Sequence, residues 1–202
     1  YYRGDVLARR TLRTVDIHGR LLETWTDSNG DGGFDILVRH DYDADGNLVS
    51  RAYDADGDGT PNFSDFYTWD AGGRRTSYAA DTDGNGLPDR VDRSIYDDGG
   101  RLIRVENDGN ADGVPESTTW YENDGAGNPL LILEDWSGDG QADRALRLTW
   151  DGLGNLIRRE FDMENDGSFE QVSVYEYDDE RRNLRSWSDY DGDGVPEDQV
   201  RT

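Results

Sequence analysis

The sequence repeats one acidic nine-residue pattern every 27 residues, and this repeat limits the chain to a tandem-repeat fold. The clearest copy is Asp54-Ala55-Asp56-Gly57-Asp58-Gly59-Thr60-Pro61-Asn62, which has the form D-x-D-G-D-G-x-x-D/N. The seven copies begin at Asp27, Asp54, Asp81, Asp108, Asp135, Asp162 and Asp189. A fixed period of this length indicates an array of similar units, each of which packs against its neighbours.

A second motif recurs with the same period and predicts a hairpin turn in each unit. Its glycines are Gly19, Gly46, Gly73, Gly100, Gly127 and Gly154. In Asp43-Ala44-Asp45-Gly46, aspartate favours the start of a type I turn, and glycine favours the left-handed position of a bulge. The seventh copy, Arg181-Arg182-Asn183-Leu184, has lost its glycine. We interpret that turn as slipped by one residue.

The segments between turn and acidic loop predict strands, because they are short and rich in β-branched and aromatic residues. We expect an all-β antiparallel β-hairpin array that forms a coiled extended sheet. A calcium-stabilised parallel β-solenoid, with one coil per unit, is the alternative. One column of the repeat is apolar and predicts a clearly buried face: Leu22, Val49, Ile103, Leu130, Ile157 and Leu184.

The repeat also predicts the domain organisation, which is a single array without a second domain. Residues 1–16 align with half a unit, and the full units cover about 17–43, 44–70, 71–97, 98–124, 125–151, 152–178 and 179–202. Repeat arrays normally finish with atypical capping units. Because none is visible here, we expect the chain to be an excerpt of a longer array.

Composition excludes several classes of protein. A formal net charge of -24 argues against a nucleic-acid partner, because binding nucleic acid requires positive charge to neutralise phosphates. Cysteine is absent, so disulfides and thiolate metal sites are excluded. No apolar run approaches the roughly 20 residues of a membrane span. No catalytic constellation lies outside the repeat pattern, so we predict that the chain is not an enzyme.

The acidic loops have the residue types of a calcium site. Calcium takes six to eight oxygen ligands, and the loop offers side-chain oxygens at positions 1, 3, 5 and 9 with a backbone carbonyl at position 7. Position 6 is glycine in all seven copies, where a sharp bend requires a positive φ. Zinc is disfavoured, because only the histidines His18 and His40 are present and cysteine is absent. Magnesium is disfavoured by its demand for rigid octahedral geometry.

We therefore predict about seven calcium ions, one in each loop. The predicted ligands are Asp27, Asn29, Asp31, Gly33 and Asp35; Asp54, Asp56, Asp58, Thr60 and Asn62; Asp81, Asp83, Asn85, Leu87 and Asp89; Asp108, Asn110, Asp112, Val114 and Glu116; Asp135, Ser137, Asp139, Gln141 and Asp143; Asp162, Glu164, Asp166, Ser168 and Glu170; and Asp189, Asp191, Asp193, Val195 and Glu197.

The loops differ in how strongly we expect them to bind calcium. Those beginning at Asp54, Asp81 and Asp189 carry the best ligand sets, whereas Ser137 and Asn165 weaken the loops at Asp135 and Asp162. Without a cation, carboxylates held this close repel one another. We expect the calcium-free chain to be loose or largely unfolded, because metal affinity then forms part of the free energy of folding.

Two resemblances follow from these motifs. The acidic loop resembles the calcium loops of thrombospondin type 3 repeats and integrin-type propellers. The segment Tyr42-Asp43-Ala44-Asp45-Gly46-Asn47-Leu48 resembles the YD repeat of bacterial RHS and teneurin-type proteins, as do residues 97–102 and 151–156. The second resemblance implies β-hairpins joined into a long coiled sheet, in large secreted or surface proteins that in some members enclose a toxin in a shell. A calcium loop in every unit departs from that pattern.

Function follows from these features as two hypotheses. The first is an extracellular or cell-surface structural or adhesive array stabilised by calcium, whose partners are calcium and other copies or flanking units. The alternative is a calcium-dependent module that binds a glycan or a surface protein, or part of an RHS-type toxin shell. Exposed, clustered side chains at Trp25, Trp120, Trp136 and Trp187 would favour binding; packed ones would favour the structural hypothesis. The aromatic column at Tyr42, Trp69, Tyr96, Trp150 and Tyr177 is expected to pack across strands.

Overall fold

The computed structural model describes residues 9–201, and its regular structure consists of fifteen β-strands. Eight residues of the half unit predicted over 1–16 lie outside the described residues. The strands are β1 Arg10–Val15, β2 Leu21–Asp27, β3 Ile36–Tyr42, β4 Leu48–Asp54, β5 Phe63–Trp69, β6 Arg75–Asp81, β7 Arg90–Tyr96, β8 Leu102–Asp108, β9 Ser117–Asn123, β10 Pro129–Asp135, β11 Arg144–Trp150, β12 Leu156–Asp162, β13 Gln171–Tyr177, β14 Asn183–Asp189 and β15 Asp198–Arg201. Within this range no helix has the length and apolar character needed to cross a membrane.

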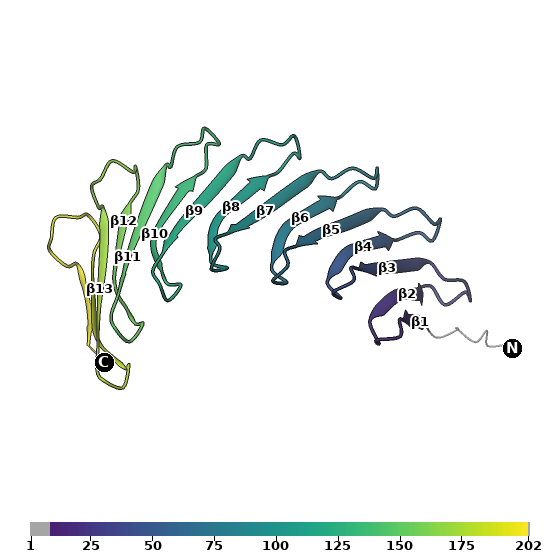
Figure 1. The fold of residues 1–202 in the computed structure, drawn as a ribbon, viewed down its shortest axis with the longest axis horizontal. Helices are drawn as coiled ribbons and strands as arrows, with labels where there is room; N and C mark the ends of the chain where they lie inside the picture. The colour runs from purple at the N-terminus through teal and green to yellow at the C-terminus, as the bar shows by residue number, and fades with distance from the viewer. Residues whose placement is uncertain (1–8, 202) are drawn as a thin grey trace, which may run out of the picture. The chain divides into compact units, whose positions relative to one another are not determined.

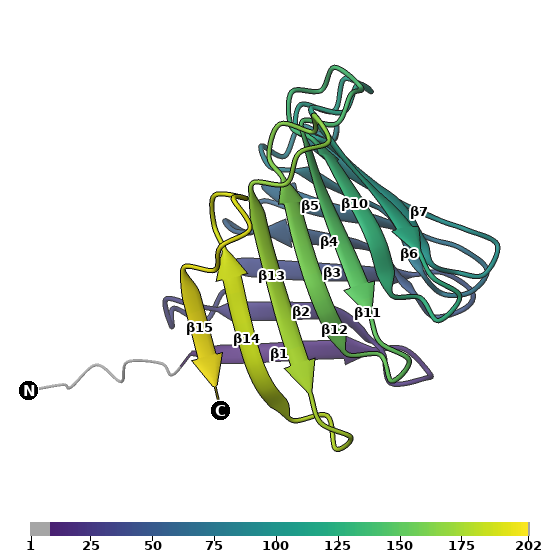
Figure 2. The same ribbon diagram turned by 90° about the vertical axis from the view of Figure 1, so that its left-hand side faces the viewer.

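Neighbouring strands are antiparallel and follow one another in chain order. The chain divides into two compact units. The first contains the described residues up to Arg93 and Asp108–Asp112, and the second contains Ser94–Asn107 and the residues from Gly113 onward. In the first unit, β2 to β6 lie side by side (Figure 1). In the second, β13, β14 and β15 alternate in direction (Figure 2). The hairpin array is confirmed, and the parallel solenoid is wrong because its coils would pair in parallel.

The short turns have the predicted bulged form. In the turn between β3 and β4, the Asp43 N–H donates to the Asn47 carbonyl at 3.0 Å and the Gly46 N–H donates to the Asp43 carbonyl at 3.2 Å. Gly46 has a φ of +92°, and the register shifts between Asp41 and Tyr42. Glycine is needed here because side chains crowd the backbone at positive φ.

The predicted slip of the seventh turn is wrong. The Arg181 N–H donates to the Asp178 carbonyl at 2.9 Å, and the Asp178 N–H donates to the Arg182 carbonyl at 3.1 Å, as in the other turns. Tyr177 pairs with Asn183 across the hairpin. The turn keeps its register because Arg181 takes the position of the missing glycine, with a φ of +63°.

The sheet has very few buried apolar side chains, in agreement with the composition. Among the described residues they are Leu37, Ala80, Ala145, Leu148 and Val172. The prediction of a clearly buried face is wrong, since Leu130 and Leu184 are 40% and 47% exposed and the other members of the column are only half-buried: Leu22, Val49, Ile103 and Ile157. Each unit is a single layer of strands, so no second layer covers this column. The first aspartates of the acidic loops are more deeply buried, with exposed fractions of 0–3%.

The aromatic column connects hairpins through hydrogen bonds as well as packing. The Trp69 indole Nε1–H donates to the Leu48 carbonyl at 2.8 Å. Asn123, a non-aromatic member of the column, donates through Nδ2 to the Leu102 carbonyl at 2.9 Å. The same bond joins Tyr42 to Leu21 and Trp150 to Pro129. Each donor lies 21 residues after its acceptor, which begins the second strand of the preceding hairpin.

Candidate metal-binding loops

The acidic loops follow the even-numbered strands, so within each unit they lie at the same end of the antiparallel strands. Asp54 is the last residue of β4, and Asp81 is the last residue of β6. The loop after β4 is closed at its far end by the Asn62 N–H, which donates to the Tyr53 carbonyl at 2.8 Å. The strand pairing therefore fixes both ends of the loop before any ion is considered.

The carboxylate at position 1 organises the loop backbone. In the loop after β4, the Gly57 N–H donates to Asp54 Oδ1 at 2.7 Å and the Gly59 N–H donates to Oδ2 at 2.9 Å. The equivalent bonds form at Asp27, Asp81, Asp135 and Asp189. The predicted positive φ at position 6 is confirmed in all seven loops: Gly32, Gly59, Gly86, Gly113, Gly140, Gly167 and Gly194.

The next acidic positions accept hydrogen bonds along the loop. In the loop after β4, the Thr60 N–H donates to Asp58 Oδ1 at 2.7 Å and the Asp58 N–H donates to Asp56 Oδ1 at 3.4 Å. The Asn62 side chain accepts the Ala55 N–H at 2.5 Å. Asp, Asn and Ser side chains make such local turns readily. These bonds set the positions of the side chains at 3, 5 and 9 without an ion.

Position 7 contributes its N–H to the position 5 side chain in six loops, at 2.7–2.8 Å. The donors are Gly33, Thr60, Leu87, Gln141, Ser168 and Val195. This bond fixes the peptide next to the carbonyl that was predicted as a ligand. The ligand role of these carbonyls, and of that of Val114, stays a prediction.

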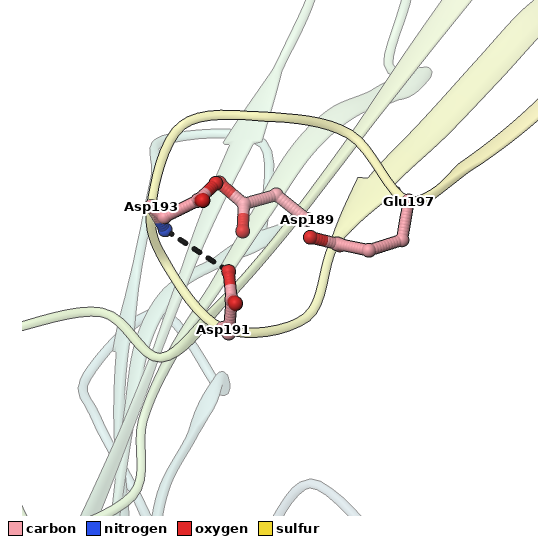
Figure 3. Close-up of side chains that lie close together, drawn as sticks. All are labelled: Asp189, Asp191, Asp193 and Glu197. Atoms are coloured by element: carbon pink, nitrogen blue, oxygen red, sulfur yellow. Dashed lines mark hydrogen bonds between the residues drawn. The ribbon is translucent and has the colours of Figure 1, made fainter.

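Carboxylate oxygens converge in the loop after β14. Asp189, Asp191, Asp193 and Glu197 each place one oxygen within 4.8 Å of the others (Figure 3). Similar groups form from residues of a single unit in three further loops: Asp54, Asp56 and Asp58; Asp81, Asp83 and Asp89; Asp162, Asp166 and Glu170. Donors that are all hard oxygens fit calcium, which accepts carboxylates at flexible geometry.

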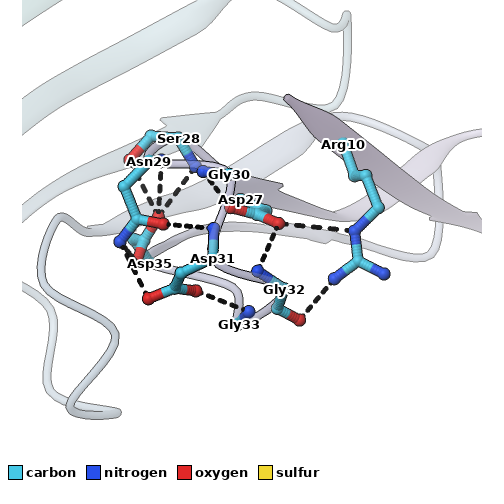
Figure 4. A network of polar contacts seen from close by, with 9 residues as sticks. All are labelled: Arg10, Asp27, Ser28, Asn29, Gly30, Asp31, Gly32, Gly33 and Asp35. Carbon is cyan, nitrogen blue, oxygen red and sulfur yellow. Dashed lines mark hydrogen bonds and ion pairs between the residues drawn. The ribbon is translucent and has the colours of Figure 1, made fainter. Parts of the chain in front are cut away.

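The loop after β2 contains a positive side chain of the protein itself. Arg10, at the start of β1, places its Nε 3.4 Å from Asp27 Oδ2, and its Nη2 donates to the Gly32 carbonyl (Figure 4). Asp27 has no exposed surface, whereas the Arg10 side chain is 52% exposed. The guanidinium therefore supplies positive charge at the position 1 carboxylate.

The remaining carboxylates of that loop are held by local donors. Asp35 Oδ2 accepts the Ser28 N–H at 2.7 Å, and the Asn29 side-chain amide donates to Asp35 at 2.9 Å and to Asp31 at 3.2 Å (Figure 4). Within residues 9–201, the carboxylates of the loops at Asp27 and Asp135 do not converge as a group of three.

The loops after β8 and β10 each differ from the other loops in their own way. In the loop after β10, Asp143 Oδ2 accepts the N–H groups of Trp136 at 2.7 Å and Ser137 at 3.0 Å. The residues of the loop after β8 belong to both units, Asp108–Asp112 to the first and those from Gly113 to the second. In its first part the Asp112 N–H donates to Asn110 Oδ1 at 2.9 Å.

Hydrogen bonding keeps several loop carboxylates ionised. The N–H of Ser28 is the largest cause of the lowered pKa of Asp35, and the Thr82 hydroxyl is the largest cause of the lowered pKa of Asp89. Burial raises the pKa of Asp135, but the N–H groups of Gly140 and Gly138 outweigh it and leave that pKa lowered. These groups stay charged well into the acidic range, as a cation site requires.

No protein-family profile and no curated protein sequence matches the chain. Several solved structures resemble it, including the following three. The crystal structure of TcdB2-TccC3-Cdc42 is 17% identical over 89% of this chain and 10% of the matched chain, with a TM-score of 0.45. The Photorhabdus luminescens Tc holotoxin pore carrying TccC3-D651A is 17% identical over 91% and 11%, with a TM-score of 0.32. TcdB2-TccC3 without its hypervariable C-terminal region is 16% identical over 91% and 12%, with a TM-score of 0.33. The chain spans about a tenth of the length of each.

Proposed function

We propose that the chain is a structural β-hairpin array whose acidic loops bind calcium outside the cell. The observation that carries this proposal is the recurrence of converging carboxylates at equivalent positions, in the loops that begin at Asp54, Asp81, Asp162 and Asp189. The loops at Asp108 and Asp135 keep the predicted ligand types and stay candidates. At Asp27 the guanidinium of Arg10 already balances part of the negative charge.

Calcium is favoured over other cations by the chemistry of the loops. Their side-chain donors are oxygens, which excludes the nitrogen and sulfur ligands typical of zinc. Calcium also binds to weaker sites in extracellular modules, where its concentration is in the millimolar range. Each saturated site adds about 2.7 kcal/mol to folding stability when the free ion is at 100 times its dissociation constant. Several such sites would offset the scarcity of buried apolar side chains.

The exposure of tryptophan side chains favours a structural role over a binding module. Among Trp25, Trp120, Trp136 and Trp187, only Trp136 is exposed, at 58%. The Arg144 guanidinium covers its ring at 4.7 Å from the centroid. A sugar-binding surface needs aromatic faces open to solvent, and these four do not form one.

A calcium titration monitored by thermal unfolding tests the proposal. The melting temperature should rise with calcium and fall with a chelator, and magnesium should have a weaker effect. The triple variant Asp58→Asn, Asp166→Asn and Asp193→Asn changes exposed position 5 carboxylates while keeping an oxygen acceptor for the loop N–H groups. This variant should lose most of the calcium-dependent rise in melting temperature.

The matched control is Asp45→Asn, Asp98→Asn and Asp179→Asn, which removes the same charge from exposed positions outside the loops. This control should keep the full calcium response. A wild-type chain with no calcium-dependent gain in melting temperature overturns the proposal, and so does a control that loses as much as the loop variant.

A wall segment of an RHS-type shell is the second candidate. It is favoured by the YD-like turn, in which Asp43 and Gly46 close a hairpin in the structure. Electron microscopy of the natural protein purified from its source separates the two candidates. A hollow closed particle supports the shell, and an extended rod or surface layer supports the adhesive array.

A further inference from the structure

Successive acidic loops of the first unit touch through their backbones. A Cβ added to Gly57, position 4 of its loop, would lie 3.1 Å from the Phe34 carbonyl oxygen and 3.2 Å from that of Asp35. A Cβ added to Gly84 would overlap the carbonyl oxygen of Pro61. Position 4 of these two loops therefore packs against positions 8 and 9 of the preceding loop, with no room for a side chain.

The second unit repeats the contact. A Cβ on Gly138 would lie 3.1 Å from the Pro115 carbonyl oxygen, and a Cβ on Gly192 would overlap that of Phe169. Position 4 of the loop after β12 is Asn165, which has a φ of +51°. Its Nδ2 donates to the Ala142 carbonyl, position 8 of the preceding loop, at 2.9 Å. The contact persists where the glycine is missing, as a side-chain hydrogen bond.

We propose that this backbone contact couples neighbouring loops, so that a cation bound in one loop raises the affinity of the next. The cation part of this inference rests on the proposed calcium function, whereas the mechanical coupling does not. Calcium binding within a unit is then cooperative between adjacent loops. Reciprocity follows, because the second loop must raise the affinity of the first by the same factor.

The hydrogen bonds show how the coupling reaches the ligands. The Gly84 N–H donates to Asp81 Oδ1 at 2.8 Å, so position 4 is bonded directly to the position 1 carboxylate. Pro61, on the other side of the contact, immediately precedes Asn62 at position 9 of the preceding loop. A shift of either backbone displaces side chains of both ligand sets. Ordering one loop therefore lowers the conformational cost of ordering its neighbour.

Two glycines in one loop provide a matched pair of variants. Gly84 and Gly86 have φ values of +74° and +87°, so alanine is strained at both. A Cβ on Gly86 meets nothing within 4 Å, whereas a Cβ on Gly84 meets the preceding loop. Gly86→Ala should perturb only its own loop, and Gly84→Ala should also perturb the loop at Asp54.

The Gly59 amide reports on the loop at Asp54, because its N–H donates to Asp54 Oδ2 at 2.9 Å. Its NMR resonance is followed through a calcium titration of the whole chain. Gly84→Ala should raise the calcium concentration for half of the Gly59 shift by about fivefold or more, the usual lower range of coupling between sites. Gly86→Ala should leave that concentration within about twofold. Equal effects of the two variants overturn the coupling.

A second pair of variants, with a less severe steric contact, tests the coupling without calcium. It also keeps the coupling testable if Gly84→Ala does not fold. Gly57→Ala makes a contact of 3.1 Å to the Phe34 carbonyl, and Gly59→Ala makes none within 4 Å. Hydrogen exchange of the Gly32 amide in chelator reports on the loop at Asp27. Exchange should be about fivefold faster in Gly57→Ala and unchanged in Gly59→Ala; equal rates in the two variants reject the coupling. If the two variants differ as expected but the melting temperature of the wild-type chain does not respond to calcium, the calcium function alone is refuted.

Discussion

The guanidinium of Arg10 forms an ion pair with Asp27, with its Nε 3.4 Å from the carboxylate Oδ2. The two residues are cross-strand partners in β1 and β2. In other hairpins the position facing the first aspartate of the loop holds a small or apolar residue: Leu37, Ser64, Thr118, Ala145 and Val172. The loop at Asp27 thus has a cation at the position facing its first aspartate. At Asp108 an arginine approaches from another position of the neighbouring strand, with Arg93 Nη1 3.8 Å from Oδ2.

Replacing Arg10 by methionine should loosen this loop. The N–H groups of Gly30 and Gly32 donate to Asp27, so their hydrogen exchange should become faster. The loss of global stability should stay below about 1 kcal/mol, because half-exposed ion pairs contribute little. Arg13→Met, in the same exposed strand, is the control. Equal exchange rates in the two variants would show that Arg10 does not hold the loop.

Aspartates at positions 1 and 5 should respond differently to replacement by asparagine. Asp54 is 3% exposed, and both of its oxygens accept backbone N–H groups. In Asp54→Asn an amide N–H₂ faces one of these donors, so stability in chelator should fall by about 1–3 kcal/mol. Asp58→Asn keeps the acceptor for Thr60 and should change stability only in calcium. Urea unfolding with and without calcium measures both, and a calcium-free loss at Asp58 as large as that at Asp54 would contradict this.

Arg181→Gly should stabilise the chain. A left-handed conformation costs a non-glycine residue about 1–2 kcal/mol, while glycine adds about 0.5–1 kcal/mol of conformational entropy to be lost on folding. The expected net gain is about 0.5–1 kcal/mol in chemical unfolding. Gly154→Ala, at the equivalent position with a φ of +81°, should destabilise by a similar amount. A loss of stability in Arg181→Gly would mean that the arginine side chain makes a contact worth more than the backbone strain.

The turn aspartates should make the fold sensitive to acid. Burial raises the pKa of Asp16, but the N–H groups of Arg20 and His18 and the Arg20 guanidinium outweigh it and lower that pKa to about 2. The Asn47 side chain chiefly lowers the pKa of Asp43. A carboxyl whose pKa is lower when folded stabilises the fold fully above its unfolded pKa, and this contribution is lost as pH falls through the folded value.

Stability should therefore decline from about pH 4 toward pH 2, the interval between the unfolded aspartate pKa and that of folded Asp16. Chemical unfolding in chelator at a series of pH values measures the decline, and carboxyl NMR titration assigns it to residues. Asp16→Asn should make the decline shallower. An identical pH profile for this variant would assign the acid sensitivity to other carboxyls.

The sequence predicted those features that act within one turn or loop. The positive φ of Gly59 and the bulge at Gly46 follow from local sterics. The loop glycine recurs in all seven copies of the repeat, and the turn glycine recurs in six. Local rules specify such positions because the interacting groups are only a few residues apart. The antiparallel array followed from the same turns.

Features that depend on the surrounding structure, beyond one turn or loop, were missed. Arg10 and Asp27 are 17 residues apart, and only the strand register brings them together. Arg181 adopts the positive φ expected only of glycine, because the hydrogen bonds of the turn and the pairing of the flanking strands outweigh the backbone strain of one residue. The exposed Leu130 and Leu184 show that an apolar column does not specify a second layer to cover it. A comparison of Arg10 with its equivalents in the repeat would have marked it as an outlier.

The hydrogen bond from Trp69 to the Leu48 carbonyl also bears on how such a gene changes in length. Each of these bonds joins the same two positions of the 27-residue repeat, and Asn123 makes the same bond with a different side chain. Recombination that removes or duplicates one 27-residue repeat would bring another donor of this column to another acceptor of the same kind. The array is therefore free to gain or lose whole repeats by unequal crossing-over without needing a compensating mutation at the junction.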